Sequence, residues 1–412
     1  MNAYAIVILA ALVLQLGLEV VAELLNLRAL GPEPPRELRD AYEPVRYQRS
    51  RDYLAAHIRF GVVAAAINMT ALLAFWFAGG FGWLDASLRA RALGPIATGL
   101  LFIGSLGLAR LVVGLPLRWW STFVLEERFG FNKTTPATFW ADTAKGLALA
   151  VALGAPLLAG ILWLFETAGA SAWLWCWLVA AAYLFVVQLV APTWIMPLFN
   201  RFTPLPDGPL RDRILAYARS VAFPLEGVFV IDGSRRSTKA NAFFTGFGRH
   251  KRIALFDTLL ASLDADQILA VLAHEIGHYK RRHVIAGMVI GVLHLGLVLF
   301  VLSRFLGSPG LFEAFAVSGR PVYAGLVFFA LLFGPIDLLL SIAHHVLSRR
   351  YERQADAFAV ATTGAGERLA AALVRLSVDS LAHPSPHRLH VLLHHSHPPL
   401  LERVHALRGQ AA

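Results

Sequence analysis

His274-Glu275-Ile276-Gly277-His278 is a short stretch that fits the pattern H-E-x-x-H. On a helix, two histidines four residues apart lie on one face and are close enough to share a metal ion. Glu275 lies about 100° around the helix from His274, so it borders the same site and is placed to take a proton from water. Because neutral imidazoles suit zinc, the stretch predicts a zinc site with Glu275 as general base.

The residues before this stretch favour the helix that the pattern needs. Asp264 is a typical N-cap, and we expect one helix from there through His278 toward the membrane at Val284. The alternative is a chance match on an amphipathic helix. His283 lies five residues after His278, about 140° around such a helix, so we exclude it as a ligand.

A catalytic zinc site needs a third protein ligand and one open position. Glu352 is the best candidate, within a charged helical segment that follows the last apolar stretch. Asp356, one turn further on, shares its face and is suited to hold a ligand histidine through the ring nitrogen that faces away from the metal. The alternative is an ordinary interfacial helix with charge pairs at i,i+4.

The composition of the chain indicates an integral membrane protein. Of 412 residues, 57% are hydrophobic and only 16% are charged, against about a quarter in soluble domains. Seven stretches have about the 20 apolar residues needed to cross a bilayer. They are residues 3–25, 58–84, 95–117, 143–165, 172–195, 284–305 and 321–343. The first lacks a basic leader and is too long for a signal peptide, so we expect it to be retained.

The basic residues lie in alternate loops, which is typical of membrane orientation. We therefore exclude nucleic acid as a partner despite the net charge of +10, and expect the lipid bilayer instead. The N-terminus is predicted to face out, with the loop 196–283 and the C-terminal tail in the cytoplasm. The single cysteine, Cys176, lies in a predicted span and permits no intrachain disulfide.

Two regions are expected along the chain. Residues 1–200 form an N-terminal transmembrane region with five helices, and residues 201–412 form a metallopeptidase domain that includes the spans 284–305 and 321–343. Short strand patterns at residues 228–231, 240–246 and 253–256 predict a small β-sheet in the second region. The fold class is therefore mainly α, with seven membrane helices and a small sheet.

Several other polar residues are noted. The histidine-rich tract 383–397 is able to bind metal adventitiously. His294 and Asp337 lie within predicted spans, where ionisable groups often line a cavity, and their role is open. Arg110 and Lys145 are expected to reach the helix ends, as long basic side chains do.

Several motifs together resemble those of the type I CAAX prenyl proteases, membrane zinc metallopeptidases of yeast, animals and many bacteria. The resemblance covers about residues 47–407. It rests on residues 120–133, Pro197 with Phe199-Asn200, residues 232–237, 241–244 and 256–259, and the zinc helix itself, all in the family's order. It implies a gluzincin-like peptidase domain and a helical barrel around a chamber into which the zinc faces.

The resemblance also implies roles for particular residues. His274, His278 and Glu352 would bind one zinc ion per chain, and Glu275 would activate water. The strand that contains Asn241, Ala242 and Phe243 would pair with an extended substrate, as free sheet edges do. His397 and Arg403 would contact the substrate near its scissile carbonyl, although a solvated tail helix is the alternative reading. Lys239 stands where many relatives have histidine, which leaves the role of that position open.

The sequence is compatible with three functions. A membrane-embedded zinc endopeptidase is favoured, acting on a peptide or protein that is prenylated or otherwise membrane-associated. A transporter or channel would explain the polar residues within the spans, and a scaffold with a structural zinc would need four protein ligands where we find three. We expect a bacterial inner membrane location. The sequence leaves open the substrate, the cleavage position, prenyl recognition and the oligomeric state.

Overall fold

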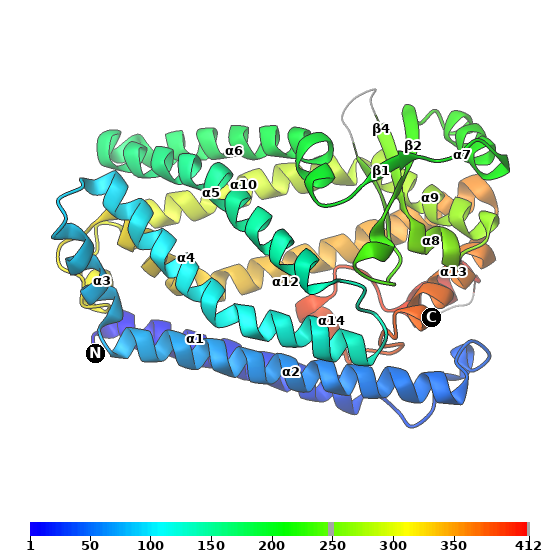
Figure 1. Ribbon diagram of the computed structural model, residues 1–412, viewed down its shortest axis with the longest axis horizontal. Helices are drawn as coiled ribbons and strands as arrows, with labels where there is room; N and C mark the ends of the chain where they lie inside the picture. The colour runs from blue at the N-terminus through cyan, green and yellow to red at the C-terminus, as the bar shows by residue number, and fades with distance from the viewer. Residues whose placement is uncertain (246–250, 410–412) are drawn as a thin grey trace.

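The computed structural model describes residues 1–245 and 251–409. Its long helices run along the long axis of the molecule, and the β-sheet lies at the end opposite the N-terminus (Figure 1). Within the described part of the chain, seven helices are long and apolar enough to cross a membrane by length and composition. The predicted number of spans is therefore confirmed.

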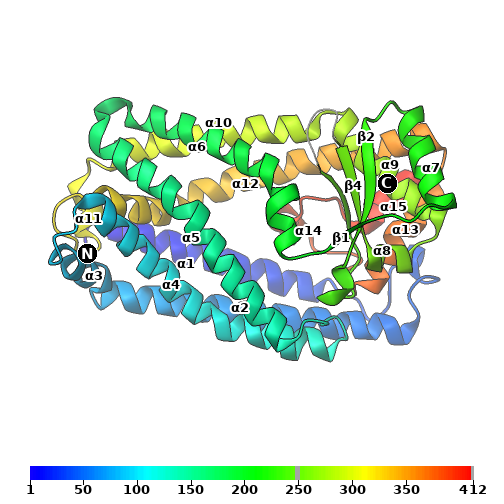
Figure 2. The same cartoon turned by 45° about the horizontal axis from the view of Figure 1, so that its top comes forward.

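The seven helices form a closed ring. Each contacts the next in the order α1, α2, α4, α5, α6, α10 and α12, and α12 contacts α1 again (Figure 2). The predicted barrel is confirmed by this closure. The helices are α1 (Ala3–Arg28), α2 (Pro44–Phe77), α4 (Pro95–Trp120), α5 (Pro136–Thr167), α6 (Ala172–Val190), α10 (His283–Phe305) and α12 (Val322–Thr363).

One predicted span boundary was wrong. The second span does not reach residue 84, because α2 ends at Phe77 and Gly79, with a φ of 74°, turns the chain into α3 (Gly80–Arg89). The helix of the last predicted span continues past residue 343, because α12 runs to Thr363. Glu352 therefore lies on the same helix as the last membrane span.

A four-stranded mixed sheet packs at the end of the barrel. Its order is β1-β2-β4-β3, with β2 and β4 parallel and the other pairs antiparallel. The strands are β1 (Phe202–Pro204), β2 (Leu225–Ile231), β3 (Ala242–Thr245) and β4 (Lys251–Phe256). The three predicted strands are present and β1 is additional; residue 246 of the predicted third strand lies outside the described residues. In the described part of the chain β3 pairs only with β4, so one edge of β3 is free.

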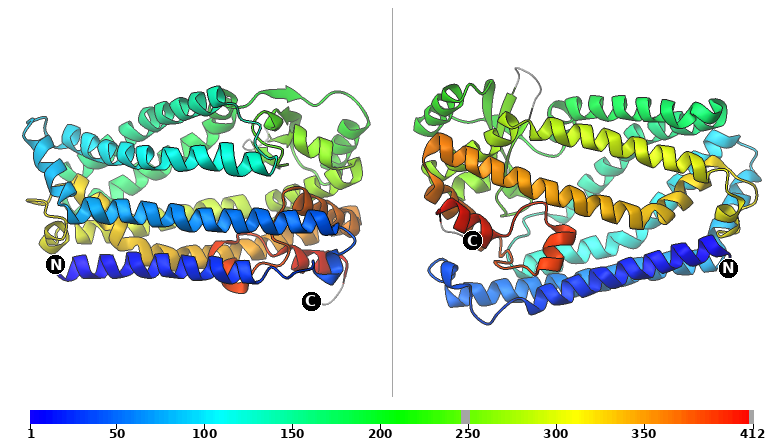
Figure 3. Two further views of the ribbon diagram at one scale, coloured as in Figure 1. Left: turned by 60° about the horizontal axis from the view of Figure 1, so that its bottom comes forward. Right: turned by 180° about the vertical axis from the view of Figure 1, so that it is seen from behind.

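Shorter helices complete this end of the molecule (Figure 3). They are α7 (Pro209–Ser220), α8 (Asp257–Ser262), α9 (Ala265–Lys280), α13 (Gly366–Asp379), α14 (Arg388–His394) and α15 (Leu400–Leu407), while α11 (Pro309–Glu313) lies between α10 and α12 in the chain. The sheet, α7, α9 and α13 share one core that includes Ile214, Leu255, Leu272 and Leu369. This core fixes α9 between the sheet and α12.

The barrel and the sheet are joined by the segment that precedes β3. Its backbone pairs with the loop after α4, through Asn132 and Ser237 and through a hydrogen bond from Lys133 N to Arg236 O at 3.0 Å. The Arg236 guanidinium donates two hydrogen bonds to the carboxylate of Asp142 on α5, at 2.8 and 3.1 Å. The segment before β3 is thereby held both to the loop that contains Asn132 and Lys133 and to Asp142 on α5.

Lys239 completes this junction. Its ammonium lies 3.2 Å from the Glu126 carboxylate and 2.8 Å from the Tyr53 hydroxyl, and it lies over the Phe131 ring at 4.7 Å. Glu126 also accepts hydrogen bonds from Tyr53 and contacts His57 Nε2 at 2.9 Å. Lys239, whose role the sequence left open, thus ties the segment before Asn241 to α2 and to the π-helical turn Ser121–Glu126 that follows α4.

We expect Arg236→Gln to destabilise the protein more than Arg235→Gln. The first change leaves the half-buried Asp142 carboxylate without its bidentate partner, at a cost of about 1–2 kcal/mol, whereas the Arg235 side chain is exposed. Thermal unfolding of both variants in detergent, followed by tryptophan fluorescence, measures the difference. Equal midpoints for the two variants would show that the pair does not hold the junction.

Candidate metal centre

Helix α9 presents the two histidines of the motif. Asp264 caps it, accepting hydrogen bonds from Asp266 N and Gln267 N, while the Gln267 side chain returns to Asp264 N. The helix ends at Lys280, and Arg282 adopts a left-handed conformation with a φ of 58°. The predicted helix from the Asp264 cap through His278 is therefore confirmed, and the chain turns before Val284 and begins α10 at His283.

Glycine at position 277 allows α9 and α12 to approach closely. A Cβ at this position would lie 3.1 Å from both the Cα and the carbonyl oxygen of Ala355. Such a contact is tighter than side chains normally make against backbone, so only glycine fits without a shift. The close approach brings Glu352, one turn before Asp356, over the face of α9 that carries the histidines.

Three donor side chains converge between these helices. His274 Nε2 and His278 Nε2 are 3.2 Å apart, and the two Glu352 oxygens lie 3.4 Å from His274 Nε2 and 3.2 Å from His278 Nε2. A tetrahedral ion bound at about 2.0–2.1 Å separates its ligands by about 3.3 Å. In residues 1–245 and 251–409 no other group of three such side chains was found to converge in this way.

The chemistry of the donor set also fits a metal ion. Glu352 is 4% exposed, and its Oε2 is buried without a hydrogen-bond partner in the described part of the chain. Burial alone would lower the pKa of His274, but hydrogen bonds to Asp356 and Glu352 raise it to about 9. The surroundings of these nitrogens therefore favour positive charge, which a bound cation would supply.

Asp356 fixes the orientation of His274. Its Oδ1 lies 2.8 Å from His274 Nδ1, so that nitrogen donates its proton to the carboxylate and Nε2 keeps its lone pair for a metal. Arg403 in turn donates to both Asp356 oxygens, at 2.9 and 2.6 Å. All three side chains are buried, so the group forms one ordered layer behind the donor atoms.

His283 faces the Nδ1 atom of His278, as Asp356 faces the Nδ1 atom of His274. Its Nε2 lies 2.9 Å from the side-chain oxygen of Gln354, which only accepts, so His283 Nδ1 carries a lone pair. That atom lies 3.1 Å from His278 Nδ1, which must then carry the proton. His278 Nε2 is therefore left with its lone pair facing Glu352. The turn at Arg282 places His283 beside His278. Counting residues along one continuous helix does not predict this position.

The other predicted residues lie around this group. Glu275 is partly buried, and burial raises the pKa of its carboxyl above the ordinary range. His397 Nε2 lies 3.3 Å from Glu352 Oε1, and its side chain is 62% exposed. Arg403 differs from His397, because its side chain is only 10% exposed and its guanidinium is engaged by Asp356. Of the two, His397 is the more accessible to a substrate.

The strand β3, which contains Ala242 and Phe243, contacts α9. Asn241 precedes it, and the Asn241 side chain accepts a hydrogen bond from Ala242 N at 2.8 Å. The Asn241 carbonyl accepts from Phe256 N at 3.1 Å, so Asn241 and Phe243 point their backbone groups toward β4. Ala242 and Phe244 consequently direct theirs to the free edge.

The histidine-rich tract takes part in packing. His390 and His394 on α14 lie 3.5 Å from Glu23 and 3.7 Å from Glu19 on α1. His383 Nε2 lies 3.0 Å from the Asn26 carbonyl oxygen. Most of the tract therefore holds the C-terminal segment against α1, and His397 alone of these residues contacts the three-residue group.

Comparison with known proteins agrees with this architecture. Residues 23–201 match the family model described as CAAX prenyl protease N-terminal, five membrane helices, and residues 204–411 match Peptidase family M48. The chain is 35% identical to CAAX prenyl protease 1 homolog of Oryza sativa, covering 98% of this chain and 97% of the relative. It is 35% identical to CAAX prenyl protease 1 of Saccharomyces cerevisiae, covering 90% and 88%.

A solved structure has the same fold over almost its whole length. The crystal structure of S. mikatae Ste24p superposes with a TM-score of 0.94 at 32% identity, covering 99% of both chains. Fold, membrane helices and the converging His-His-Glu group thus agree with one family. The chain belongs to the M48 peptidases of the CAAX prenyl protease 1 type and is a multi-pass membrane metallopeptidase that hydrolyses peptide bonds.

Proposed function

We propose that this chain is a zinc endopeptidase in which His274, His278 and Glu352 hold one zinc ion and Glu275 is the general base. The observation that carries the proposal is the convergence of two imidazole nitrogens and one carboxylate at 3.2–3.4 Å, with Asp356 and His283 each facing the Nδ1 atom of one imidazole. When bound, zinc supplies a Lewis acid that polarises a carbonyl and lowers the pKa of water.

The protein's own groups then move the proton. Glu275 accepts a proton from the attacking water and delivers it to the leaving amine, and its raised pKa suits both steps because the carboxyl holds the proton between them. The exposed His397 donates to the developing oxyanion of the substrate. Arg403, buried against Asp356, acts mainly by holding Asp356 and through it His274, with a weaker electrostatic effect on the substrate.

The free edge of β3 is proposed to bind the substrate as an added strand. Ala242 and Phe244 offer backbone groups at this edge, and Asn241 lies at its start. Because β3 contacts α9, a peptide paired there would run past the donor group. The relatives are named for cleavage of CAAX prenyl proteins, so a prenylated peptide is the first substrate to test, with a misfolded membrane protein as the second.

We also propose a location and a division of the chain. The positive-inside pattern supports an outward N-terminus, with the peptidase end and the C-terminal tail in the cytoplasm of a bacterial inner membrane. The position of the N-terminus opposite the sheet is consistent with this orientation (Figure 1). Residues 1–200 would supply five helices, and residues 201–412 the peptidase domain with two more.

Glu275→Gln is expected to retain one zinc per chain and to lose activity by about 10²–10⁴-fold, because an amide cannot accept the proton. His278→Ala is expected to lose the metal as well. Zinc content by mass spectrometry and cleavage of a farnesylated CAAX peptide separate the two effects. Asp266→Asn, on an exposed part of α9, is the control. Wild-type cleavage by both site variants would overturn the peptidase assignment.

His283→Phe is expected to weaken zinc affinity by about 10–100-fold, as loss of a group that orients a ligand usually does. Phenylalanine preserves the stacking of this ring on Tyr351, where the centroids are 4.3 Å apart, and removes the contacts with His278 and Gln354. Competition with a calibrated chelator measures the affinity. If His283→Phe binds zinc as tightly as the wild type, the His283 contact does not orient His278.

Ala242→Pro is expected to raise KM by about three- to tenfold, because it removes the backbone donor that would leave the Asn241 side chain to pair with the substrate, a bond worth about 1 kcal/mol. The pairing of β3 with β4 uses Asn241 and Phe243 instead and should survive. An unchanged thermal midpoint with a higher KM supports strand addition. An unchanged KM means that the substrate does not use this edge.

A further inference from the structure

A cavity lies between the membrane helices, apart from the metal centre. It has a volume of about 650 Å³, within the range of about 300–1,000 Å³ that is usual for small-molecule sites. Helices α1, α2, α4 and α12 line it, together with Phe81 of α3. Its walls are mostly leucine, alanine, valine and phenylalanine, so it is suited to a hydrocarbon chain.

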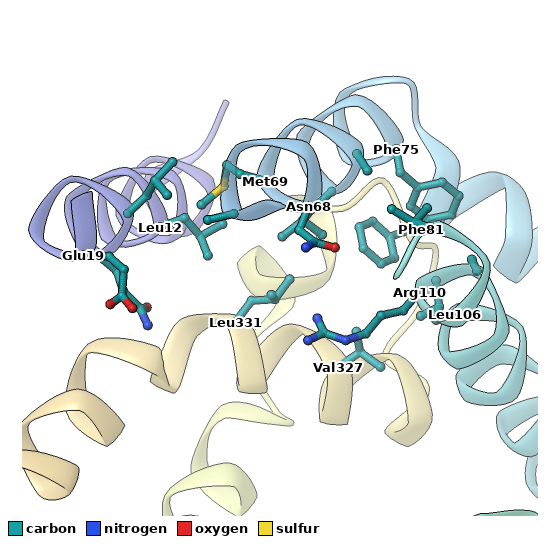
Figure 4. A pocket seen from close by; sticks show the side chains of 17 residues that line it. Leu12, Glu19, Asn68, Met69, Phe75, Phe81, Leu106, Arg110, Val327 and Leu331 are labelled. Atoms are coloured by element: carbon teal, nitrogen blue, oxygen red, sulfur yellow. The ribbon is translucent and has the colours of Figure 1, made fainter. Parts of the chain in front are cut away.

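Two charged side chains line this cavity, Glu19 and Arg110. Figure 4 shows the Arg110 guanidinium reaching from α4 into the space near Val327 and Leu331. In the described part of the chain Arg110 makes no hydrogen bond or ion pair. It lies about ten residues from the nearer end of α4, about 15 Å at 1.5 Å per residue, so the expectation that it reaches a helix end was wrong.

The cavity wall differs along its length, and its polar residues are Gln15, Glu19, Asn68 and Arg110. Phe75 and Phe81 lie near the end of α2 and the start of α3, at the end of the barrel that carries the N-terminus. Arg110 lies deeper, about 22 Å along α4 from Pro95. Glu19, at the far end of the cavity in Figure 4, is 3.7 Å from His394. An anion is therefore favoured at Arg110 and not at Glu19.

We propose that this cavity binds an anionic lipid-like molecule, with its carboxylate or phosphate at Arg110 and one hydrocarbon chain extending toward Phe75 and Phe81. An arginine inside a membrane helix is costly unless it faces water or a partner, and a bound anion supplies that partner. The apolar walls contribute affinity through the buried chain, and Arg110 selects the charged headgroup.

The test uses stearic acid that carries a diazirine on its chain, and stearyl alcohol with the same diazirine as the uncharged match. Each is photo-crosslinked to the full-length protein in phosphatidylcholine nanodiscs at alkaline pH, and labelled peptides are located by mass spectrometry. The wild type is expected to show labelling of the cavity helices that excess stearate suppresses, with the acid favoured over the alcohol by about tenfold, as one charge-assisted hydrogen bond allows.

Four variants distinguish the outcomes. Arg110→Gln should abolish the preference for the acid, and Arg110→Lys should keep most of it. Arg304→Gln, a charge loss at the exposed end of α10, should leave it unchanged. Leu331→Trp should fill the cavity and reduce labelling by both probes. Thermal midpoints near that of the wild type verify folding.

Three results would overturn the proposal. The first is a preference for the acid that persists in Arg110→Gln, and the second is labelling spread evenly over the lipid-facing helices. The third is displacement of the label by a farnesylated CAAX peptide at concentrations near its KM, with stearate a competitive inhibitor of cleavage. That result would make the cavity part of the substrate path rather than a separate lipid site.

Discussion

The close packing of α9 on α12 at Gly277 is the constraint on which the metal centre depends. The H-E-x-x-H stretch supplies only two donors, and the third comes from a helix that also crosses the membrane. A side chain at position 277 would meet the backbone of Ala355 at 3.1 Å and push Glu352 away from the histidines. Because α12 is continuous from Val322 to Thr363, the membrane barrel and the donor group share one rigid element.

Charge balance explains why so many ionisable groups remain buried together. Glu275, Glu352 and Asp356 carry three negative charges and Arg403 carries one positive charge, which leaves two negative charges if the histidines are neutral. Buried charge is costly unless it is compensated. A divalent cation would neutralise the group by binding to the deprotonated Nε2 atoms, while Asp356 and His283 face the Nδ1 atoms of the two imidazoles.

The sequence predicted what depends on local pattern. Seven spans follow from apolar length, and the histidine spacing and the Asp264 cap predict the α9 helix. What failed depends on single backbone conformations or on long-range packing. The positive φ of Gly79 ended a helix that apolar periodicity would extend. The engagement of Arg403 by Asp356 depends on how α15 packs against α12, which spacing along the chain does not encode.

The barrel is more than a membrane anchor for the peptidase end. β3 is fixed on one side by β4, and the residues before it are fixed by Glu126 and Asp142, which belong to the membrane helices. The position of the free edge relative to α9 therefore depends on both halves of the chain. A soluble fragment that kept the three donors would lose these anchors. Alignment of the substrate in this protein therefore depends on the membrane helices.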